Sequence, residues 1–252
     1  MLKHERKPIA LTIAGSDSSG DAGIQADLKT FAALGVHGAS AITCITAQNP
    51  RVISRVELCA PGLVREQIEA VFSYAPPRAA KTGLLCSTAI IREVARFFLR
   101  RRDVPLVVDP VMIATSGTRL LPEAAVEMLK RDLLPLATLV TPNLAEAEVL
   151  AAEEIRTPEE LRAAARNIHR KYGCAALVKG GHLAVASVAL DFLCSAEGEW
   201  MFSAPRIKGV RLHGTGCIYS AAITAWLARG KPLVKAVELA KAHMTKVISQ
   251  MR

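Results

Sequence analysis

Short apolar runs alternate along the chain with stretches in which apolar residues recur every three or four positions. The first run, residues 8–14, ends at Gly15 and is typical of a buried strand that enters a turn. Residues 22–34 follow, with their apolar side chains on one face of a predicted helix that Gly35 ends. The same patterns predict strands at residues 39–47, 52–58, 79–82, 106–108, 138–140, 175–178, 190–194 and 199–202, and helices at residues 62–72, 89–101, 123–131, 144–152, 158–172, 216–227 and 233–249.

This alternation predicts the α/β class, as a three-layer α/β/α sandwich with a mainly parallel central sheet. Residues 52–58 fit an edge strand or a flap, and the last two strands fit a hairpin that turns at Glu197 and Gly198. Because no repeat or linker interrupts the pattern, we expect a single domain over residues 1–252. Ligands of such sheets bind at the carboxyl ends of the strands, so the loops there are the candidates for function.

Composition narrows the class of protein. The 252 residues carry 32 basic and 23 acidic side chains, for a formal net charge of +9. The positive charge is spread out and no aromatic residues interleave with it, so a basic balance suits an anionic substrate better than nucleic acid. No segment approaches the ~20 apolar residues of a membrane span. The six cysteines form no Cys-x-x-Cys pair, which excludes a zinc knuckle of that kind and favours a reducing, cytoplasmic location.

Two glycine-containing loops precede predicted helices. Residues 15–23 are rich in glycine and serine, which permits close approach to a ligand, although the loop contains no Gly-Lys-Ser/Thr ending. In the second loop Gly214 and Gly216 bracket Thr215, and Cys217 follows in the first turn of the helix. Backbone amides at such a helix start form an anion site, and the helix dipole favours a thiolate. The alternative is an ordinary glycine cap with a buried cysteine.

Three other predicted strands end in polar residues. These residues are Asp109, then Asn143 with Glu146, and finally Lys179. Carboxylates can hold Mg²⁺ beside phosphates, and a lysine can neutralise phosphate charge. Each position also has a structural reading, since Glu146 fits a helix cap as well as a ligand.

These segments, taken in order, resemble the hydroxymethylpyrimidine/phosphomethylpyrimidine kinases of the ribokinase-like superfamily. The resemblance covers nearly the whole chain and rests on the combination of residues 10–17 (ALTIAGSD), 23–30 (GIQADLKT), 46–49 (TAQN), 81–83 (KTG), 109–112 (DPVM), 141–143 (TPN), 178–182 (VKGGH) and 213–217 (HGTGC). It implies a transferase that uses ATP and Mg²⁺ to phosphorylate 4-amino-5-hydroxymethyl-2-methylpyrimidine and its monophosphate in thiamin biosynthesis. It also implies a homodimer.

The resemblance assigns roles to individual residues. The pyrimidine pocket would be lined by Gly15, Asp27, Gln48, Leu84, Val111 and Cys217. The anion hole would comprise Gly214, Thr215, Gly216 and Cys217, with Cys217 as the base, and we expect its pKa to be low enough for ready alkylation. Asp109 and Glu146 would lie by Mg²⁺, and Asn143, Lys179 and Lys241 by ATP.

The chain departs from the family pattern at several positions. Asp21 stands where the first loop usually has glycine, and Thr115 stands where lysine is common. Arg211 and Leu212 replace the usual Asn-Thr before the anion hole. Thr115 favours one alternative, a catalytically inactive pyrimidine-binding homologue. A pyridoxine or pyridoxal kinase also stays open, because that substrate is likewise a hydroxymethylated ring.

Overall fold

The computed structural model describes residues 7–49, 51–113, 120–181, 183, 188–207 and 214–250. Within these residues nine strands form one sheet in the order β3-β2-β1-β4-β5-β6-β7-β8-β9. The strands are β1 (Ile9–Asp17), β2 (His37–Asn49), β3 (Val52–Leu58), β4 (Ala79–Thr82), β5 (Leu106–Val108), β6 (Leu139–Val140), β7 (Ala175–Gly180), β8 (Val188–Ser195) and β9 (Gly198–Pro205). The helices are α1 (Gly23–Ala33), α2 (Pro61–Tyr74), α3 (Thr88–Leu99), α4 (Glu123–Met128), α5 (Leu144–Ala151), α6 (Pro158–Tyr172), α7 (Thr215–Ala228) and α8 (Leu233–Gln250).

The centre of the sheet is parallel, as the sequence predicts. Strands β2, β1, β4, β5, β6 and β7 run in one direction. The first edge is β3, which pairs antiparallel with β2, so the segment that fitted an edge strand or a flap is an edge strand. At the other edge β8 and β9 form the expected hairpin, with Ser195 opposite Gly198, so the turn lies at residues 196 and 197, one position before the predicted one.

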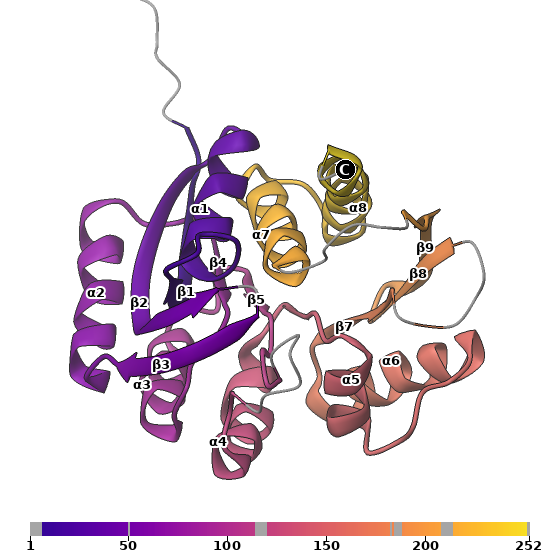
Figure 1. The fold of residues 1–252 in the computed structure, drawn as a ribbon, viewed down its shortest axis with the longest axis horizontal. Coiled ribbons are helices and arrows are strands. Elements are labelled where there is room, and N and C mark those ends of the chain that lie inside the picture. The colour runs from indigo at the N-terminus through magenta and orange to yellow at the C-terminus, as the bar shows by residue number, and fades with distance from the viewer. Residues whose placement is uncertain are drawn as a thin grey trace, which may run out of the picture.

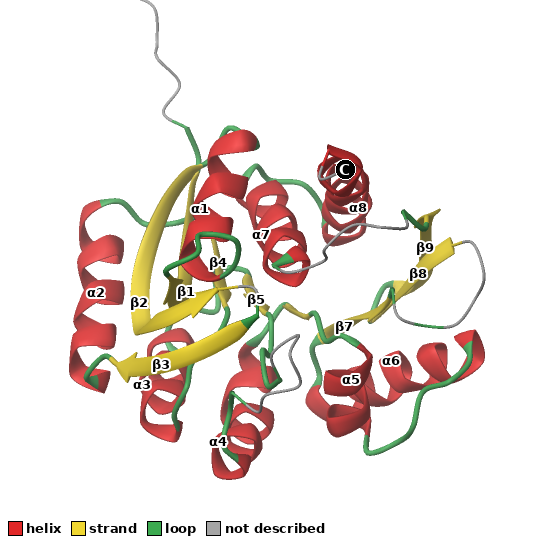
Figure 2. Ribbon diagram, viewed as in Figure 1, coloured by secondary structure: helices red, strands yellow, loops and turns green. Residues whose placement is uncertain are grey.

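Alternate residues of the buried strands face two separate layers of helices. In β5, Leu106 and Val108 join the apolar cluster packed against α2 to α6, whereas Val107 joins the cluster of α7 and α8. Helix α1 packs on the same side as α7, around Phe31. Figures 1 and 2 show these layers, with α1, α7 and α8 across the sheet from α3, α4, α5 and α6. The three-layer α/β/α fold is confirmed.

Several predicted boundaries shift by one to three residues, and two of these shifts have identifiable reasons. The first strand continues beyond residue 14 to Asp17, because a bulge lets Ser16 and Asp17 keep pairing with β2. The helix predicted over residues 123–131 is α-helical only to Met128, after which the chain widens into a π-helical turn over Leu129–Leu133. Pro135 follows in a short 3₁₀ turn, and proline has no amide hydrogen to continue the α-helical bonding.

The predicted start of α6 is confirmed in detail. The Glu160 amide donates to Thr157 Oγ1 at 3.2 Å, and the Thr157 amide donates to Glu160 Oε2 at 3.0 Å. This capping box satisfies amides that have no helical partner. Among the described residues, no helix is both long and apolar enough to cross a membrane.

Candidate active site

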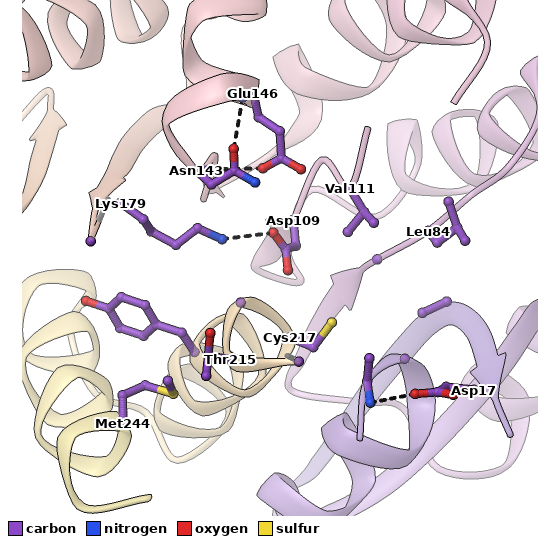
Figure 3. Close-up of a pocket in the computed structure, with 18 of the residues that line it drawn as sticks. Asp17, Leu84, Asp109, Val111, Asn143, Glu146, Lys179, Thr215, Cys217 and Met244 are labelled. Carbon is purple, nitrogen blue, oxygen red and sulfur yellow. Dashed lines mark hydrogen bonds and ion pairs between the residues drawn. The ribbon is translucent and has the colours of Figure 1, made fainter. Parts of the chain in front are cut away.

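A cleft of about 700 Å³ runs along the carboxyl edge of the parallel strands. Loops after β1, β4, β5, β6 and β7 form one wall, and the starts of α7 and the face of α8 form the other. Figure 3 shows side chains from these distant segments pointing into one space. The cleft brings together Gly15, Gln48, Leu84, Asp109, Val111, Asn143, Glu146, Lys179, Gly214, Thr215, Gly216, Cys217 and Lys241.

The glycines at the start of α7 allow close backbone approaches. Gly214 adopts a φ of 76°, and a Cβ there would lie 1.9 Å from the carbonyl oxygen of Asp21. A Cβ at Gly216 would lie 3.3 Å from Nζ of Lys179 and 4.0 Å from Oδ2 of Asp109. The first turn of α7 therefore lies directly against a lysine and a carboxylate, where its amides add positive potential.

Lys179 and Asp109 form an ion pair across neighbouring strand ends. Lys179 Nζ lies 3.2 Å from Asp109 Oδ1, and both side chains are largely buried. Ser220 of α7 donates to Asp109 Oδ2 at 3.1 Å, so the carboxylate is held from the sheet and from the helix. Burial lowers the pKa of Lys179, but the charges of Asp109 and Glu146 outweigh it and hold this pKa above its ordinary value. The ammonium is therefore charged and available to an anion.

Asn143 and Glu146 form a second capping box, at the start of α5. Glu146 donates its amide to Asn143 Oδ1 at 3.0 Å, and the Asn143 amide donates to Glu146 Oε2 at 2.9 Å. The Met112 amide donates to the other carboxylate oxygen at 3.2 Å. Glu146 is therefore a helix cap that also lines the cleft. Burial raises its pKa to about 6, since the nearby Lys179 charge only partly opposes it.

Backbone contacts shape the other end of the cleft, around Gln48. Ser18 Oγ donates to the Gln48 carbonyl at 2.8 Å and accepts from the Gln48 amide at 2.9 Å. These bonds fix the loop after β1 to β2. A Cβ at Gly15 would lie 2.7 Å from Cys44 Sγ, so only glycine fits there without a shift. Gly15, Gln48, Leu84 and Val111 thus all line the cleft, and their binding of a pyrimidine stays a prediction.

Asp27 does not line the cleft, contrary to expectation. It is fully buried beneath the floor, where both carboxylate oxygens contact Lys81 Nζ, at 2.9 and 2.8 Å. Thr12 donates a further hydrogen bond to it at 2.6 Å. Lys81 lines the cleft instead; the sequence analysis quoted it in the motif at residues 81–83 but gave it no role. Its signal was a charged residue inside the predicted strand at residues 79–82.

Cys217 lies in the cleft as expected, but its thiol is protonated and not ionised. Its sulfur points from the start of α7 into the cleft (Figure 3). Burial raises the pKa of Cys217 to about 12, because desolvation outweighs the Lys81 charge, and Asp27 and Asp109 oppose ionisation as well. The expectation of a readily alkylated thiolate in the free protein is therefore corrected, since the helix start and Lys81 do not overcome burial.

Lys241 lies at the far end of the cleft and is held by Asp191, which the sequence analysis did not single out. Lys241 Nζ lies 2.6 Å from Asp191 Oδ2, and Gly180 donates its amide to Oδ1 at 3.2 Å. Asp191 is the buried polar residue of the predicted strand at residues 190–194, which was its only signal. Small and apolar residues of β8, β9 and α8 line the cleft beside this pair: Ala189, Ala204, Pro205, Met244 and Ile248.

Some of the discussed positions lie outside the described residues. These are Thr115, His182, Arg211, Leu212 and His213. What the departures from the family pattern at residues 115, 211 and 212 do to the site therefore stays a prediction.

Comparisons with known proteins agree with one another. The sequence profile of the phosphomethylpyrimidine kinase family matches residues 17–252. A hydroxymethylpyrimidine/phosphomethylpyrimidine kinase of Rhizobium meliloti is 50% identical over 96% of this chain and 90% of its own length. A bifunctional thiamine biosynthesis protein of Geobacter sulfurreducens is 45% identical over 98% of this chain, which spans 51% of that longer protein.

Solved structures show the same fold. The phosphomethylpyrimidine kinase of Clostridium difficile 630 has a TM-score of 0.85 at 42% identity, covering 96% of this chain and 100% of that one. The pyridoxal kinase of Staphylococcus aureus in complex with ADP has a TM-score of 0.88 at 34% identity, covering 96% and 88%. The order of motifs, the shared fold and the family match lead to one conclusion: this chain belongs to the phosphomethylpyrimidine kinase family and is a phosphotransferase.

Proposed function

We propose that this protein transfers the γ-phosphate of ATP to the hydroxymethyl group of 4-amino-5-hydroxymethyl-2-methylpyrimidine, and then phosphorylates the resulting monophosphate, for thiamine biosynthesis. The observation that carries the proposal is the meeting of Lys179, Asp109 and Gly216 at the centre of the cleft. Backbone amides and a charged lysine there face the place where phosphoryl charge must be stabilised. The curated relatives bear the corresponding name at up to 50% identity.

The cleft separates the two substrates. Gln48, Leu84 and Val111 lie at the end where we place the pyrimidine. The side-chain amide of Gln48 has the donor and the acceptor that an aminopyrimidine edge requires. Lys241 and the apolar residues beside it lie at the other end, where we place the nucleotide. The γ-phosphate then reaches the start of α7, between the two.

Phosphoryl transfer needs positioning and charge stabilisation more than covalent help from the protein. The hydroxymethyl oxygen forms a bond to the γ-phosphorus as the bond from that phosphorus to the β,γ-bridging oxygen breaks. ADP leaves with the electron pair of the broken bond. The hydroxyl proton passes to the Cys217 sulfur in its thiolate form. Amides of the first turn of α7 and the Lys179 ammonium stabilise the charge on the phosphoryl oxygens.

The carboxylates of the cleft fit Mg²⁺. Asp109 and Glu146 offer hard oxygen ligands, and Mg²⁺ in such sites is usually held by one or two carboxylates together with substrate phosphates and water. When bound with ATP, the ion would neutralise phosphate charge. Within the described part of the chain no group of three or more His, Cys, Asp or Glu residues forms a metal cluster by itself.

A pyridoxal kinase activity is the second candidate. It is favoured by the S. aureus pyridoxal kinase, which has a TM-score of 0.88 to this chain. Pyridoxal also carries a hydroxymethyl group on an aromatic nitrogen ring, so one pocket can present either substrate to the same phosphate.

ADP formation tests both candidates. We expect purified protein with ATP and Mg²⁺ to release ADP with the aminopyrimidine alcohol and with its monophosphate, at a higher kcat/KM than with pyridoxal. Competition between the two rings in one reaction measures the preference directly. ADP release with pyridoxal alone would reverse the assignment. No ADP release with either, together with measurable binding of the pyrimidine by calorimetry, would indicate an inactive binding protein.

A further inference from the structure

A buried ion pair lies behind the pyrimidine end of the cleft and no step described above uses it. Lys81 and Asp27 have no solvent-exposed side-chain surface. Lysine is almost never fully buried unless it is paired, since removing its charge from water is unfavourable. A neutral apolar pair would fill the same space, so the presence of two charges here calls for a reason.

The ammonium is fixed and oriented. Asp27 accepts from Lys81 Nζ with both oxygens, and Thr12 holds the same carboxylate from the next strand at 2.6 Å. Among the described residues, Asp27 is the one hydrogen-bond acceptor of Nζ, although an ammonium has three hydrogens to donate. Burial lowers the pKa of Lys81, but the charges of Asp27, Cys217 and Asp109 and the hydrogen bond to Asp27 together outweigh it and keep this pKa above its ordinary value.

Gly83 lies beside the ammonium, between β4 and the cleft lining. Gly83 lines the cleft, and a Cβ on it would lie 3.5 Å from Lys81 Nζ and 2.9 Å from the Ala14 Cβ. A larger residue at position 83 would therefore press on Ala14 and contact the ammonium. Glycine at position 83 adds no side chain near the ammonium, so nothing at this position weakens the effect of the charge on the cleft.

The positive end of the pair is the end nearer to Cys217. Lys81 and Cys217 line the same cleft, whereas Asp27 does not, so the lysine is the member of the pair on the side of the sulfur. Its charge lowers the pKa of Cys217, against burial. The other groups that act on this sulfur are Asp109 after β5, Lys179 of β7 and the Gly23 amide at the start of α1. The pair is thus a fixed dipole directed at the start of α7.

We propose that Lys81 is a positioning residue for phosphoryl transfer: held by Asp27 and Thr12 behind Gly83, its ammonium presents a fixed positive charge to Cys217 and to the substrate oxygen beside it. The inference rests on the proposed function for its catalytic consequence. The charge stabilises the anion that forms when the hydroxymethyl proton is lost, and it does so without contacting the substrate. A preformed charge in a dry site needs no reorganisation during the reaction.

The test replaces the pair as a unit, because removing one partner leaves a buried charge unpaired. The variants are the double substitutions Lys81→Met/Asp27→Leu and Lys81→Gln/Asp27→Asn. Either one can serve as the test if its melting temperature lies within a few degrees of that of the wild type. The matched control is Arg166→Met/Glu199→Gln, which removes an ion pair on the surface between α6 and β9. It should leave kcat, KM and Cys217 alkylation unchanged.

We expect the neutral pairs to lower kcat at least tenfold while the KM for ATP changes less than twofold. We also expect iodoacetamide to alkylate Cys217 at least tenfold more slowly at pH 9, measured by mass spectrometry without any substrate. A folded neutral pair with wild-type kcat and wild-type alkylation would overturn the proposal. If the wild type lacks kinase activity but the alkylation rate still falls, the proposed function fails and the electrostatic role of Lys81 stands.

A measurement on the wild-type protein needs no variant. The side-chain ¹³Cε and ¹⁵Nζ shifts of Lys81 should show a charged ammonium from pH 6 to pH 10. A Lys81 amine that loses its proton in this range would contradict the proposal, whatever the variants do.

Discussion

Gly216 of α7 rests against Lys179 of β7: a Cβ on this glycine would lie 3.3 Å from the lysine Nζ. The contact places the first turn of a helix and a charged side chain at one point of the cleft. Its consequence is that position 216 tolerates no side chain without moving the ammonium.

We therefore expect Gly216→Ala to lower kcat by up to about tenfold, because the ammonium must move by a few tenths of an ångström and misplacing a positioning group by ~1 Å can cost about 10²-fold. Steady-state ADP release measures the effect. The matched control is Gly62→Ala in α2, where a Cβ meets no atom within 4 Å and the cleft is not involved. Equal activities of the two variants would show that the Gly216 contact does not position Lys179.

Gln48→Ala should raise the KM for the pyrimidine more than it lowers kcat. The side-chain amide of Gln48 would bind the ring equally in the ground state and the transition state, which is uniform binding. Losing a buried hydrogen bond costs ~1–3 kcal/mol, so KM should rise about tenfold to a hundredfold. Gln250→Ala, at the exposed end of α8, is the control. An unchanged KM would place the ring elsewhere in the cleft.

Cys217 should be alkylated slowly near neutral pH in the free protein. Because burial raises its pKa to about 12, the reactive thiolate is scarce at pH 7 and increases about tenfold for each pH unit up to pH 10. Mass spectrometry after a short iodoacetamide pulse gives the rate at this residue. A rate that reaches a plateau below pH 9 would contradict the raised pKa.

The same cysteine should matter for turnover. Cys217→Ala should lower kcat by roughly 10²–10⁴-fold, the usual contribution of a positioned base, while ATP still binds. Since the base is the thiolate, kcat of the wild type should rise with pH from 7 to 9. If Cys217→Ala keeps a kcat near that of the wild type, the helix amides and Lys179 carry catalysis and Cys217 only fills space.

Asp191→Asn should weaken ATP binding through Lys241. Asparagine can keep the bond from the Gly180 amide but loses the charge that holds Lys241 at 2.6 Å. We expect a KM for ATP several-fold higher, with a smaller change in kcat. In a double-mutant cycle with Lys241→Met the two effects should be non-additive, because the residues act as one unit. Strict additivity would separate Asp191 from nucleotide binding.

The sequence by itself determined the layers and the place of the site. In β5, three consecutive apolar residues predict a strand buried on both faces, and Leu106 and Val107 do face opposite layers of helices. At the start of α6, Thr157 and Glu160 are three residues apart, and their capping box forms from local geometry alone. Such features depend on periodicity and short-range bonding, which sequence spacing carries.

Only the tertiary structure decided which charges meet. Asp27 and Lys81 are 54 positions apart, and their pairing became visible only when α1 was packed on β1, the strand beside β4. That packing removes Asp27 from the cleft and places a lysine behind it. The raised pKa of Cys217 has the same origin, since a helix start favours a thiolate but burial among distant segments opposes it. Desolvation and long-range charge depend on the three-dimensional surroundings of a group, which no local pattern of residues specifies.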